Sequence, residues 1–160
     1  NFGGGLGINY DCPTCGLIPD FTSYFQIFAD FFEAQPGQQL HFELGRSLVG
    51  QCGSLISRVL YVKEGKHKKF VILDAGMNDL LRPALYQAFH RIENLTSVQP
   101  HEKYDIVGPI CESSDCFGKD RDLPATQRGD LLAIRSCGAY GEVMASRYNL
   151  RELPGSYFSE

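Results

Sequence analysis

The chain has 160 residues, of which 43% are apolar and 21% charged, and its formal net charge is -4. This length suits one globular domain, or one small domain with part of another. The mild negative charge argues against nucleic acid or an anionic membrane as a partner, and no apolar run is long enough to predict a membrane-spanning helix.

The chain begins with a glycine-rich stretch, Gly3-Gly4-Gly5-Leu6-Gly7. Backbone N–H groups without side chains in the way can hold a phosphate just before a helix, although glycine clusters also occur in ordinary turns. Such a loop normally follows a strand, and none precedes it here. We therefore expect the chain to be a piece of a longer protein.

Six cysteines are present, and Cys12-Pro13-Thr14-Cys15 contains two of them. No secretory signal is visible, so we expect a cytoplasmic location and reduced thiols. A zinc site normally needs a second Cys pair or nearby His residues, and none stands at ligand spacing. We expect no metal site.

The first predicted element is a helix over residues 19–34, because aromatic residues recur there at helical spacing and Pro36-Gly37 ends the pattern. Residues 40–44 predict a short strand. A glycine loop, a helix and a strand in this order indicate the end of an α/β unit.

After Gly45 the sequence becomes typical of a mainly β domain, a β-sandwich or barrel. Residues 64–67 predict a turn between two strands. We place the boundary near residues 45–50, which gives an α/β part over 1–46 and a β-domain over 47–160. The predicted strands lie within residues 47–62, 69–73, 91–98, 104–110 and 130–135.

Two segments of the first half carry charged groups at useful spacings. Glu43 and Arg46 lie three residues apart around Gly45, which suits an active-site carboxylate and guanidinium or, alternatively, a surface ion pair. Arg82 and Tyr86 are four residues apart and would share one face of a helical turn, where together they suit a carboxylate. The alternative for Arg82 is a solvated side chain.

The densest polar segment is Gly108-Pro109-Ile110-Cys111-Glu112-Ser113-Ser114-Asp115, directly after a predicted strand. Cys111 is a candidate proton donor or nucleophile, or else a buried structural cysteine. Tyr140 stands between glycines that let a ligand or another chain come close. Its alternative role is packing.

Five segments in order resemble the diaminopimelate decarboxylases, members of the alanine-racemase-like (fold type III) group that depends on pyridoxal phosphate (PLP). They are GGGLG from Gly3, FELGR ending at Arg46, DAGMNDLLRPALY ending at Tyr86, GPICESSD from Gly108 and GAYG from Gly138. The resemblance implies a PLP-binding, TIM-like α/β barrel followed by a β-domain, so residues 1–46 would be the last α/β unit of that barrel. It further implies a homodimer whose active sites are each completed by both subunits. It also implies conversion of meso-2,6-diaminopimelate to L-lysine and CO₂.

The resemblance also implies roles for individual residues. Glu43 would pair with the pyridine nitrogen of PLP, Arg46 would lie near phosphate and substrate, and Cys111 would reprotonate the product carbon across the dimer interface. The remaining cofactor positions are Gly3, Gly4 and Gly5 at the phosphate, Gly45, and Tyr140, which would contact PLP and substrate. The remaining substrate positions are Arg82, Tyr86 and Glu112.

This sequence departs from the usual Glu-Pro-Gly-Arg, reading Glu43-Leu44-Gly45-Arg46, but both charged groups remain. The lysine that forms the Schiff base would lie upstream, since no lysine here has a matching context. Cys111-Glu112-Ser113 favours diaminopimelate over ornithine. Two alternatives stay open: an ornithine or arginine decarboxylase of the same fold, and a dimerisation or binding module without catalysis.

Overall fold

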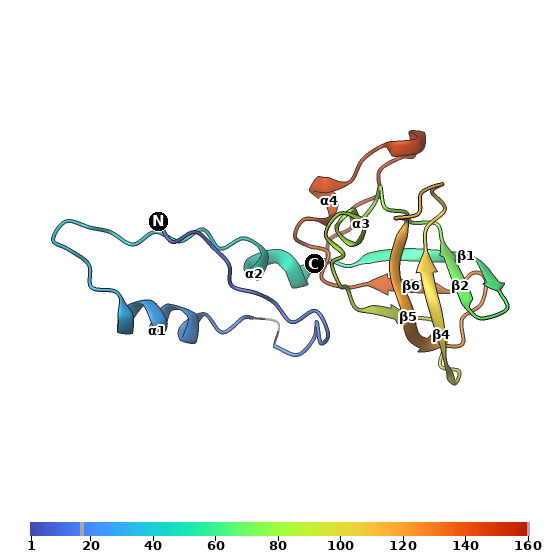
Figure 1. Ribbon diagram of the computed structural model, residues 1–160, viewed down its shortest axis with the longest axis horizontal. Coiled ribbons are helices and arrows are strands. Elements are labelled where there is room, and N and C mark those ends of the chain that lie inside the picture. The colour runs from blue at the N-terminus through green and yellow to red at the C-terminus, as the bar shows by residue number, and fades with distance from the viewer. Residues whose placement is uncertain (17, 160) are drawn as a thin grey trace.

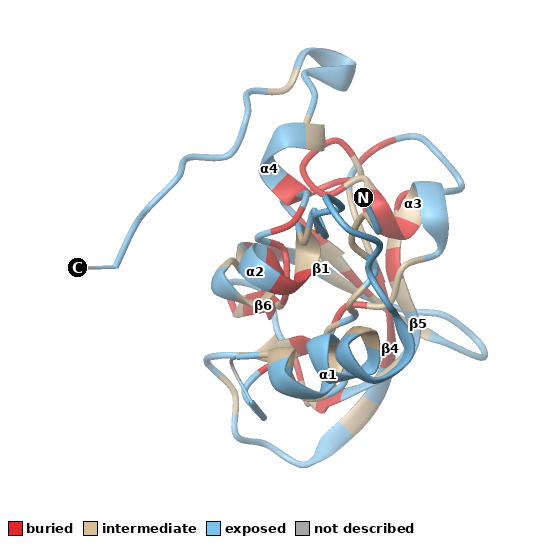
Figure 2. Ribbon diagram, turned by 90° about the vertical axis from the view of Figure 1, so that its left-hand side faces the viewer, coloured by how far each residue is buried: buried red, intermediate tan, exposed pale blue. Residues whose placement is uncertain are grey.

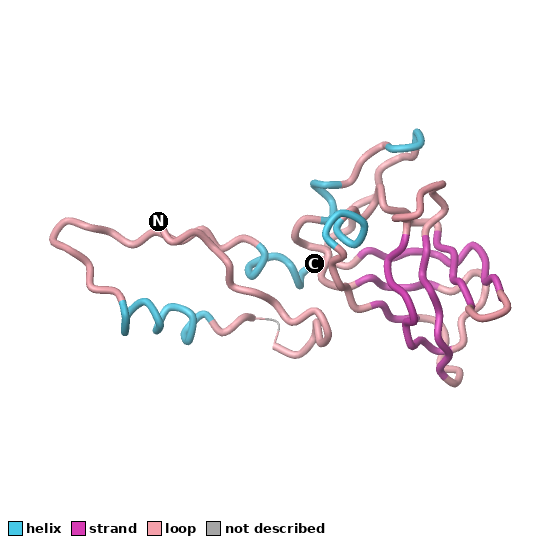
Figure 3. The backbone as a smooth tube through the Cα atoms, viewed as in Figure 1, coloured by secondary structure: helices cyan, strands magenta, loops and turns pink. Residues whose placement is uncertain are grey.

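The computed structural model describes residues 1–16 and 18–159, and they form an extended arm and a sheet domain (Figure 1). The arm, residues 1–54, carries the helices α1, α2 and η1, and every strand of the described chain lies in the sheet domain (Figure 3). In chain order the elements are α1 Phe21–Phe31, α2 Arg46–Val49, η1 Gly50–Cys52, β1 Leu55–Glu64, β2 Lys69–Leu73, α3 Arg82–Tyr86, β3 Ile92–Asn94, β4 His101–Val107, β5 Cys116–Pro124, β6 Leu131–Ile134, α4 Gly141–Met144 and η2 Tyr148–Leu150.

The predicted helix at residues 19–34 is confirmed as the shorter α1. The Asp20 side chain caps it by accepting a hydrogen bond from the Ser23 N–H at 3.0 Å, which satisfies one of the free amides at a helix start. Its aromatic residues pack on rings from both ends of the arm: Phe28 lies 4.9 Å from Phe2 and 4.8 Å from Phe42 between centroids. No residue of α1 is buried, so its apolar face lacks a cover within the described chain.

The predicted strand at residues 40–44 is wrong. This segment makes only two backbone hydrogen bonds of ladder type, from Phe2 N–H to His41 O at 2.9 Å and from Glu43 N–H to Gly3 O at 2.7 Å. A strand inside a barrel needs a neighbour on each side. In this chain the segment finds only the first few residues of the arm.

A six-stranded sheet in the order β3-β6-β1-β2-β4-β5 makes up the second part of the chain. The long strand β1 pairs with β6 through its first half and with β2 through its second, both antiparallel. Among the strands of the described residues, only β2 and β4 pair in parallel. The edge strands β3 and β5 contact each other, so the sheet curls into a nearly closed barrel, as the mainly β expectation required.

The strand predicted at residues 69–73 is confirmed with the same bounds, and three others are confirmed with shifted ends. The fifth, within residues 47–62, begins only at Leu55 because residues 46–52 are helical. One strand, β5, was missed. Its middle reads Lys119-Asp120-Arg121-Asp122, which hides the alternation of apolar residues expected of a strand. It forms by antiparallel pairing with β4 rather than through local preference.

The core lies inside the curled sheet, where Figure 2 shows the buried residues gathered along the strands. It is built from the inward side chains of neighbouring strands, with the arm contributing none of its buried hydrophobic members. Its fully buried members are Val71, Leu73, Ile106, Leu132 and Ile134.

His90 is a fully buried polar residue beside this core. Its Nδ1–H donates to the Arg135 carbonyl at 2.9 Å, since a carbonyl only accepts, and its Nε2 has no partner among the described residues. Burial lowers the pKa of His90, and the positive charges of Arg82 and Arg121 lower it further. His90 is therefore held neutral near pH 7.

We predict that this histidine makes folding sensitive to mild acid. Below about pH 6.5, the ordinary pKa of histidine, His90 binds a proton in the unfolded chain but stays neutral in the folded protein. The free energy of unfolding should therefore fall as the pH drops, by up to about 1.4 kcal/mol per pH unit. Urea unfolding between pH 7 and pH 5 measures this slope.

The His90→Gln variant should lose that part of the slope. The matched control is His101→Gln, since His101 is exposed and pairs with Asp122 at 2.7 Å. Parallel slopes for the wild type and His90→Gln would show that another group carries the effect.

Cys12 and Cys15 form a disulfide, which corrects the expectation that all the cysteines are reduced. Cys52, Cys111, Cys116 and Cys137 are free. Within residues 1–16 and 18–159 no group of three potential metal ligands occurs, and no helix is long and apolar enough to cross a membrane.

Candidate active site

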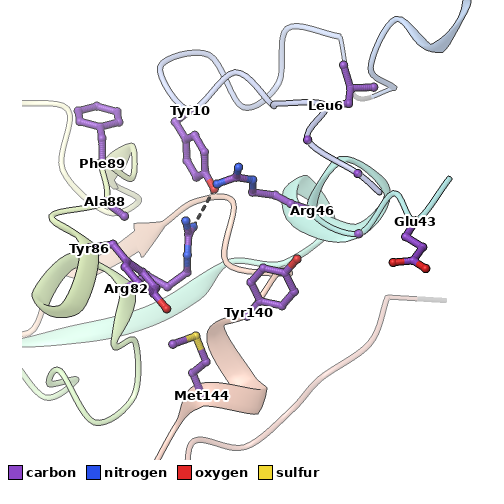
Figure 4. Close-up of a pocket in the computed structure, with 13 residues that line it drawn as sticks. Leu6, Tyr10, Glu43, Arg46, Arg82, Tyr86, Ala88, Phe89, Tyr140 and Met144 are labelled. Atoms are coloured by element: carbon purple, nitrogen blue, oxygen red, sulfur yellow. Dashed lines mark hydrogen bonds between the residues drawn. The ribbon is translucent and has the colours of Figure 1, made fainter. Parts of the chain in front are cut away.

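A cavity of about 710 Å³ lies between the arm and the sheet domain (Figure 4). Four separate stretches of chain reach it: the glycine loop, the start of α2, α3 with the residues after it, and the region of α4. Most of the residues singled out from the sequence are in its wall. The lining consists of Gly4, Gly5, Leu6, Tyr10, Glu43, Gly45, Arg46, Arg82, Tyr86, Ala88, Phe89, Tyr140 and Met144.

The glycine loop forms the wall on the arm side, and its backbone needs glycine. A Cβ on Gly4 would lie 2.6 Å from the Glu43 carbonyl oxygen, and Gly5 has φ +100° with open space where a side chain would stand. Gly3 does not line the cavity; its carbonyl accepts the Glu43 N–H and so ties the two segments together. The loop thus presents bare backbone to the cavity.

Helix α3 places Arg82 and Tyr86 on the same cavity, which confirms the predicted helical turn. Pro83 suits the first turn of a helix because no N–H is required there. The Arg82 side chain is buried, and its Nη1 donates to the Tyr10 hydroxyl at 2.7 Å, the contact dashed in Figure 4. Its guanidinium also lies over the Tyr10 ring, 5.7 Å from the centroid.

Arg46 and Tyr140 approach the cavity from the opposite wall. The Nε of Arg46 is buried and has no hydrogen-bond partner in the part of the chain that the structure describes. Gly45 leaves room for Tyr140, whose hydroxyl would lie 3.0 Å from a Cβ at that position. A buried guanidinium nitrogen without an acceptor is a place where an anion would be stabilised.

Glu43 also lines the cavity, and its carboxylate accepts a hydrogen bond from the Asn1 side-chain amide. In Figure 4 it lies apart from the group formed by Tyr10, Arg46, Arg82 and Tyr140. The cavity therefore offers one carboxylate and two guanidinium groups. Such a cavity suits a ligand with anionic groups and one cationic or protonated atom.

Cys111 and Glu112 do not line this cavity. Both are exposed, which excludes the alternative that Cys111 is a buried structural cysteine. The Glu112 carboxylate accepts a hydrogen bond from the Tyr148 hydroxyl, and this bond raises the pKa of Tyr148. The chain therefore presents these two candidates on its surface.

The loop that carries them, residues 108–115, is nevertheless well anchored. The buried Asp115 carboxylate accepts from the Met77 N–H at 2.7 Å and from the Ile110 N–H at 2.6 Å. Burial raises the pKa of Asp115, while these two hydrogen bonds oppose the rise. The anchored loop holds Cys111 and Glu112 in a defined position.

Several cavity residues escaped the sequence analysis. Tyr10 is the most important, because it holds Arg82, and the only signal for it was its place shortly after the glycine loop. Ala88 and Phe89 follow α3 and carry no motif. Leu6 and Met144 are ordinary apolar residues whose position depends on the fold.

Residues 10–138 match the family described as pyridoxal-dependent decarboxylase, C-terminal sheet domain. The chain belongs to the pyridoxal-dependent decarboxylases. Among curated proteins it is 65% identical over 160 residues to the diaminopimelate decarboxylase of Bacteroides thetaiotaomicron, covering all of this chain and 42% of that protein. The enzyme of that name from Vibrio cholerae is 48% identical over 150 residues, or 93% of this chain and 35% of the relative.

Solved structures of this family agree with the sheet domain and the arm. A diaminopimelate decarboxylase from Helicobacter pylori complexed with L-lysine has a TM-score of 0.78 at 45% identity, covering 94% of this chain and 37% of that one. A lysine/ornithine decarboxylase from Vibrio vulnificus has a TM-score of 0.79 at 22% identity, over 94% of this chain and 40% of that chain, which shows a shared fold alone. The chain thus spans well under half the length of these decarboxylases.

The cavity fits pyridoxal phosphate on two counts. The bare backbone at Gly4 and Gly5 and the unpartnered Nε of Arg46 suit its phosphate, and the Glu43 carboxylate is available for a protonated ring nitrogen. No lysine is among the described residues that line the cavity. The Schiff-base lysine expected of a pyridoxal-dependent decarboxylase has no candidate here.

Proposed function

We propose that this chain is the C-terminal part of an enzyme that uses PLP to convert meso-2,6-diaminopimelate to L-lysine and CO₂. The observation that carries the proposal is the convergence of the glycine loop, Glu43, Arg46, Arg82 and Tyr140 on one cavity. The relatives at 65% and 48% identity are both named diaminopimelate decarboxylase, the enzyme of this reaction.

In the whole protein, residues 1–46 would be the end of a PLP-binding α/β barrel and residues 47–160 the sheet domain. The arm supports this division because its helix α1 has no buried residue, and Phe31 is 87% exposed. In the whole protein, the segment that corresponds to the upstream part of the relatives would supply the neighbouring barrel strands. It would also cover this apolar face and provide the Schiff-base lysine. We propose a cytoplasmic enzyme.

The glycine loop, with Gly3 supporting Gly4 and Gly5, would hold the phosphate of PLP together with Arg46. When bound, PLP withdraws electrons from the Cα of an amino acid. The Glu43 carboxylate would favour a proton on the pyridine nitrogen, which strengthens that withdrawal. Gly45 keeps this wall open, and the Tyr140 hydroxyl beside it would contact both cofactor and substrate.

Arg82 and Tyr86 would bind a substrate carboxylate. A planar guanidinium makes two parallel hydrogen bonds to a carboxylate, and Tyr10 already holds Arg82 in place. Diaminopimelate carries an ammonium and a carboxylate at its far end, so its site needs both an anion and a cation. Glu112 would supply the anion and an arginine the cation.

Cys111 would give the proton from its Sγ to the carbon that has lost CO₂. Because Cys111 and Glu112 lie outside the cavity of their own chain, we propose that they complete the cavity of a partner subunit in a homodimer. Each active site would then take its cofactor residues from one subunit and its proton donor from the other.

Assay of the full-length protein tests the proposed reaction. With PLP and meso-diaminopimelate it should release CO₂ and L-lysine in equal amounts, and ornithine and arginine should react at least about 100-fold more slowly, because they leave the buried polar groups for the far carboxylate unpaired. Turnover of ornithine without turnover of diaminopimelate would contradict the proposal. Absence of a barrel lysine in the full-length sequence would indicate a module without catalysis.

A further prediction concerns residues 1–160 alone. Without the lysine they should neither form a covalent imine with PLP nor release CO₂. Mass spectrometry after incubation with PLP and borohydride measures this, with the full-length protein as the positive control. A stoichiometric adduct on one lysine of this chain would contradict the expectation.

A further inference from the structure

The disulfide between Cys12 and Cys15 closes a turn directly after Tyr10. The Asn9 side chain accepts from the N–H groups of Asp11 and Cys12, each at 3.0 Å, and so forms a tight turn around Tyr10. The Cys15 N–H then donates to the Cys12 carbonyl at 3.1 Å. Two successive turns that share Cys12 therefore hold the backbone beside Tyr10.

This closed turn is fixed to the rest of the chain. The Gln51 side-chain amide donates to the Pro13 carbonyl at 2.9 Å, and Pro13 itself is buried. A covalently closed, anchored turn has few alternative conformations. The backbone of Tyr10, two residues before Cys12, is restricted in the same way.

Tyr10 in turn holds the cation of the substrate site. Its hydroxyl accepts from Arg82 Nη1, its ring lies under the Arg82 guanidinium, and its edge packs on the buried His90 ring at 5.2 Å between centroids. Few other groups restrain Arg82: among the hydrogen bonds of the described residues, its side chain makes only the one to Tyr10. Tyr10 therefore supplies the hydrogen bond that orients the buried Arg82 guanidinium.

We propose that Cys12 and Cys15 form a redox-responsive pair whose disulfide, acting through Tyr10, holds Arg82 in its substrate-binding position, and whose reduction weakens substrate binding. Cys15 is exposed and Cys12 half-buried, so a dithiol reductant reaches the bridge. The reductant's thiolate attacks the Cys15 sulfur and releases Cys12 as a thiol. Its second thiol then displaces Cys15, leaving two protein thiols and an oxidised, cyclic disulfide reductant.

The kinetic test rests on the proposed function and uses the full-length enzyme, oxidised or reduced with dithiothreitol and then desalted without oxygen. Reduction should raise KM for meso-diaminopimelate about fivefold with little change in kcat, because a less ordered Arg82 costs binding free energy. The Cys12→Ser/Cys15→Ser double variant should show the high KM in both states. The control Cys52→Ser, which removes an exposed free thiol, should respond like the wild type.

A second readout does not depend on activity. Phenylglyoxal modifies accessible arginines, and Arg82 is 6% exposed in the disulfide form. Its modification, followed by mass spectrometry, should become several-fold faster after reduction, and Tyr10→Phe should be fast in both states. Equal KM and equal Arg82 modification in the two redox states would overturn the proposal. Unequal modification in a protein that does not act on diaminopimelate would contradict the proposed function instead.

Discussion

Replacing Arg82 by alanine in the full-length enzyme should raise KM for meso-diaminopimelate about 10- to 100-fold. A charge-assisted hydrogen-bond pair to a carboxylate contributes roughly 1.5–3 kcal/mol, and Arg82 is the buried guanidinium of the cavity. Steady-state kinetics with a parallel measurement of PLP affinity checks this. The affinity for PLP should change little, because Arg82 lies on the wall opposite the glycine loop.

Two further variants separate binding from folding. Arg82→Lys keeps the charge but loses the planar fork, so it should fall between wild type and Arg82→Ala. Arg58→Ala removes an exposed arginine that donates to the Gly129 carbonyl away from the cavity, and its KM should match wild type. An Arg82→Ala enzyme with unchanged kcat/KM would remove Arg82 from the substrate site.

Cys111→Ala should lower kcat about 10²- to 10⁴-fold, the usual contribution of a positioned general acid, with much smaller loss of PLP affinity. The physical reason is that Cys111 is exposed, outside the cofactor cavity and supported by the anchored loop rather than by core packing. Steady-state measurement of L-lysine formation and titration with PLP give the two quantities. Equal loss of turnover and PLP binding would show a structural role for Cys111, and Cys52→Ala provides the control for removing an exposed thiol.

The sequence predicted those elements whose formation depends on residues close together in the chain. The four-residue spacing of Arg82 and Tyr86, with Pro83 near the start, predicted the helical turn that places both on the cavity. Short runs rich in apolar residues identified β2 with its observed bounds and β4 and β6 with small errors at the ends. The glycine cluster predicted the bare backbone at the cavity. The structure shows why glycine is needed at Gly4, since a Cβ there would collide with the Glu43 carbonyl oxygen.

The missed features depend on contacts between distant segments. Strand β5 has a charged centre and forms because β4 pairs with it. Residues 40–44 are apolar enough for a strand but lack neighbours in this chain. No spacing rule joins Tyr10 to Arg82, 72 residues away, and the bonding of Cys12 to Cys15 was missed because the absence of a secretory signal argued for free thiols.

The proposal that each chain contributes to two active sites rests on the division of the site residues between cavity and surface, and mixed dimers test it directly. In a dimer of one Arg82→Ala subunit and one Cys111→Ala subunit, one active site receives both substitutions and the other receives neither. At a meso-diaminopimelate concentration well below the wild-type KM, each variant alone is slow, and random mixing should therefore restore about a quarter of the wild-type rate of lysine formation. A mixture that stays as inactive as its parents would contradict the shared site, because each active site would then carry one substitution of its own.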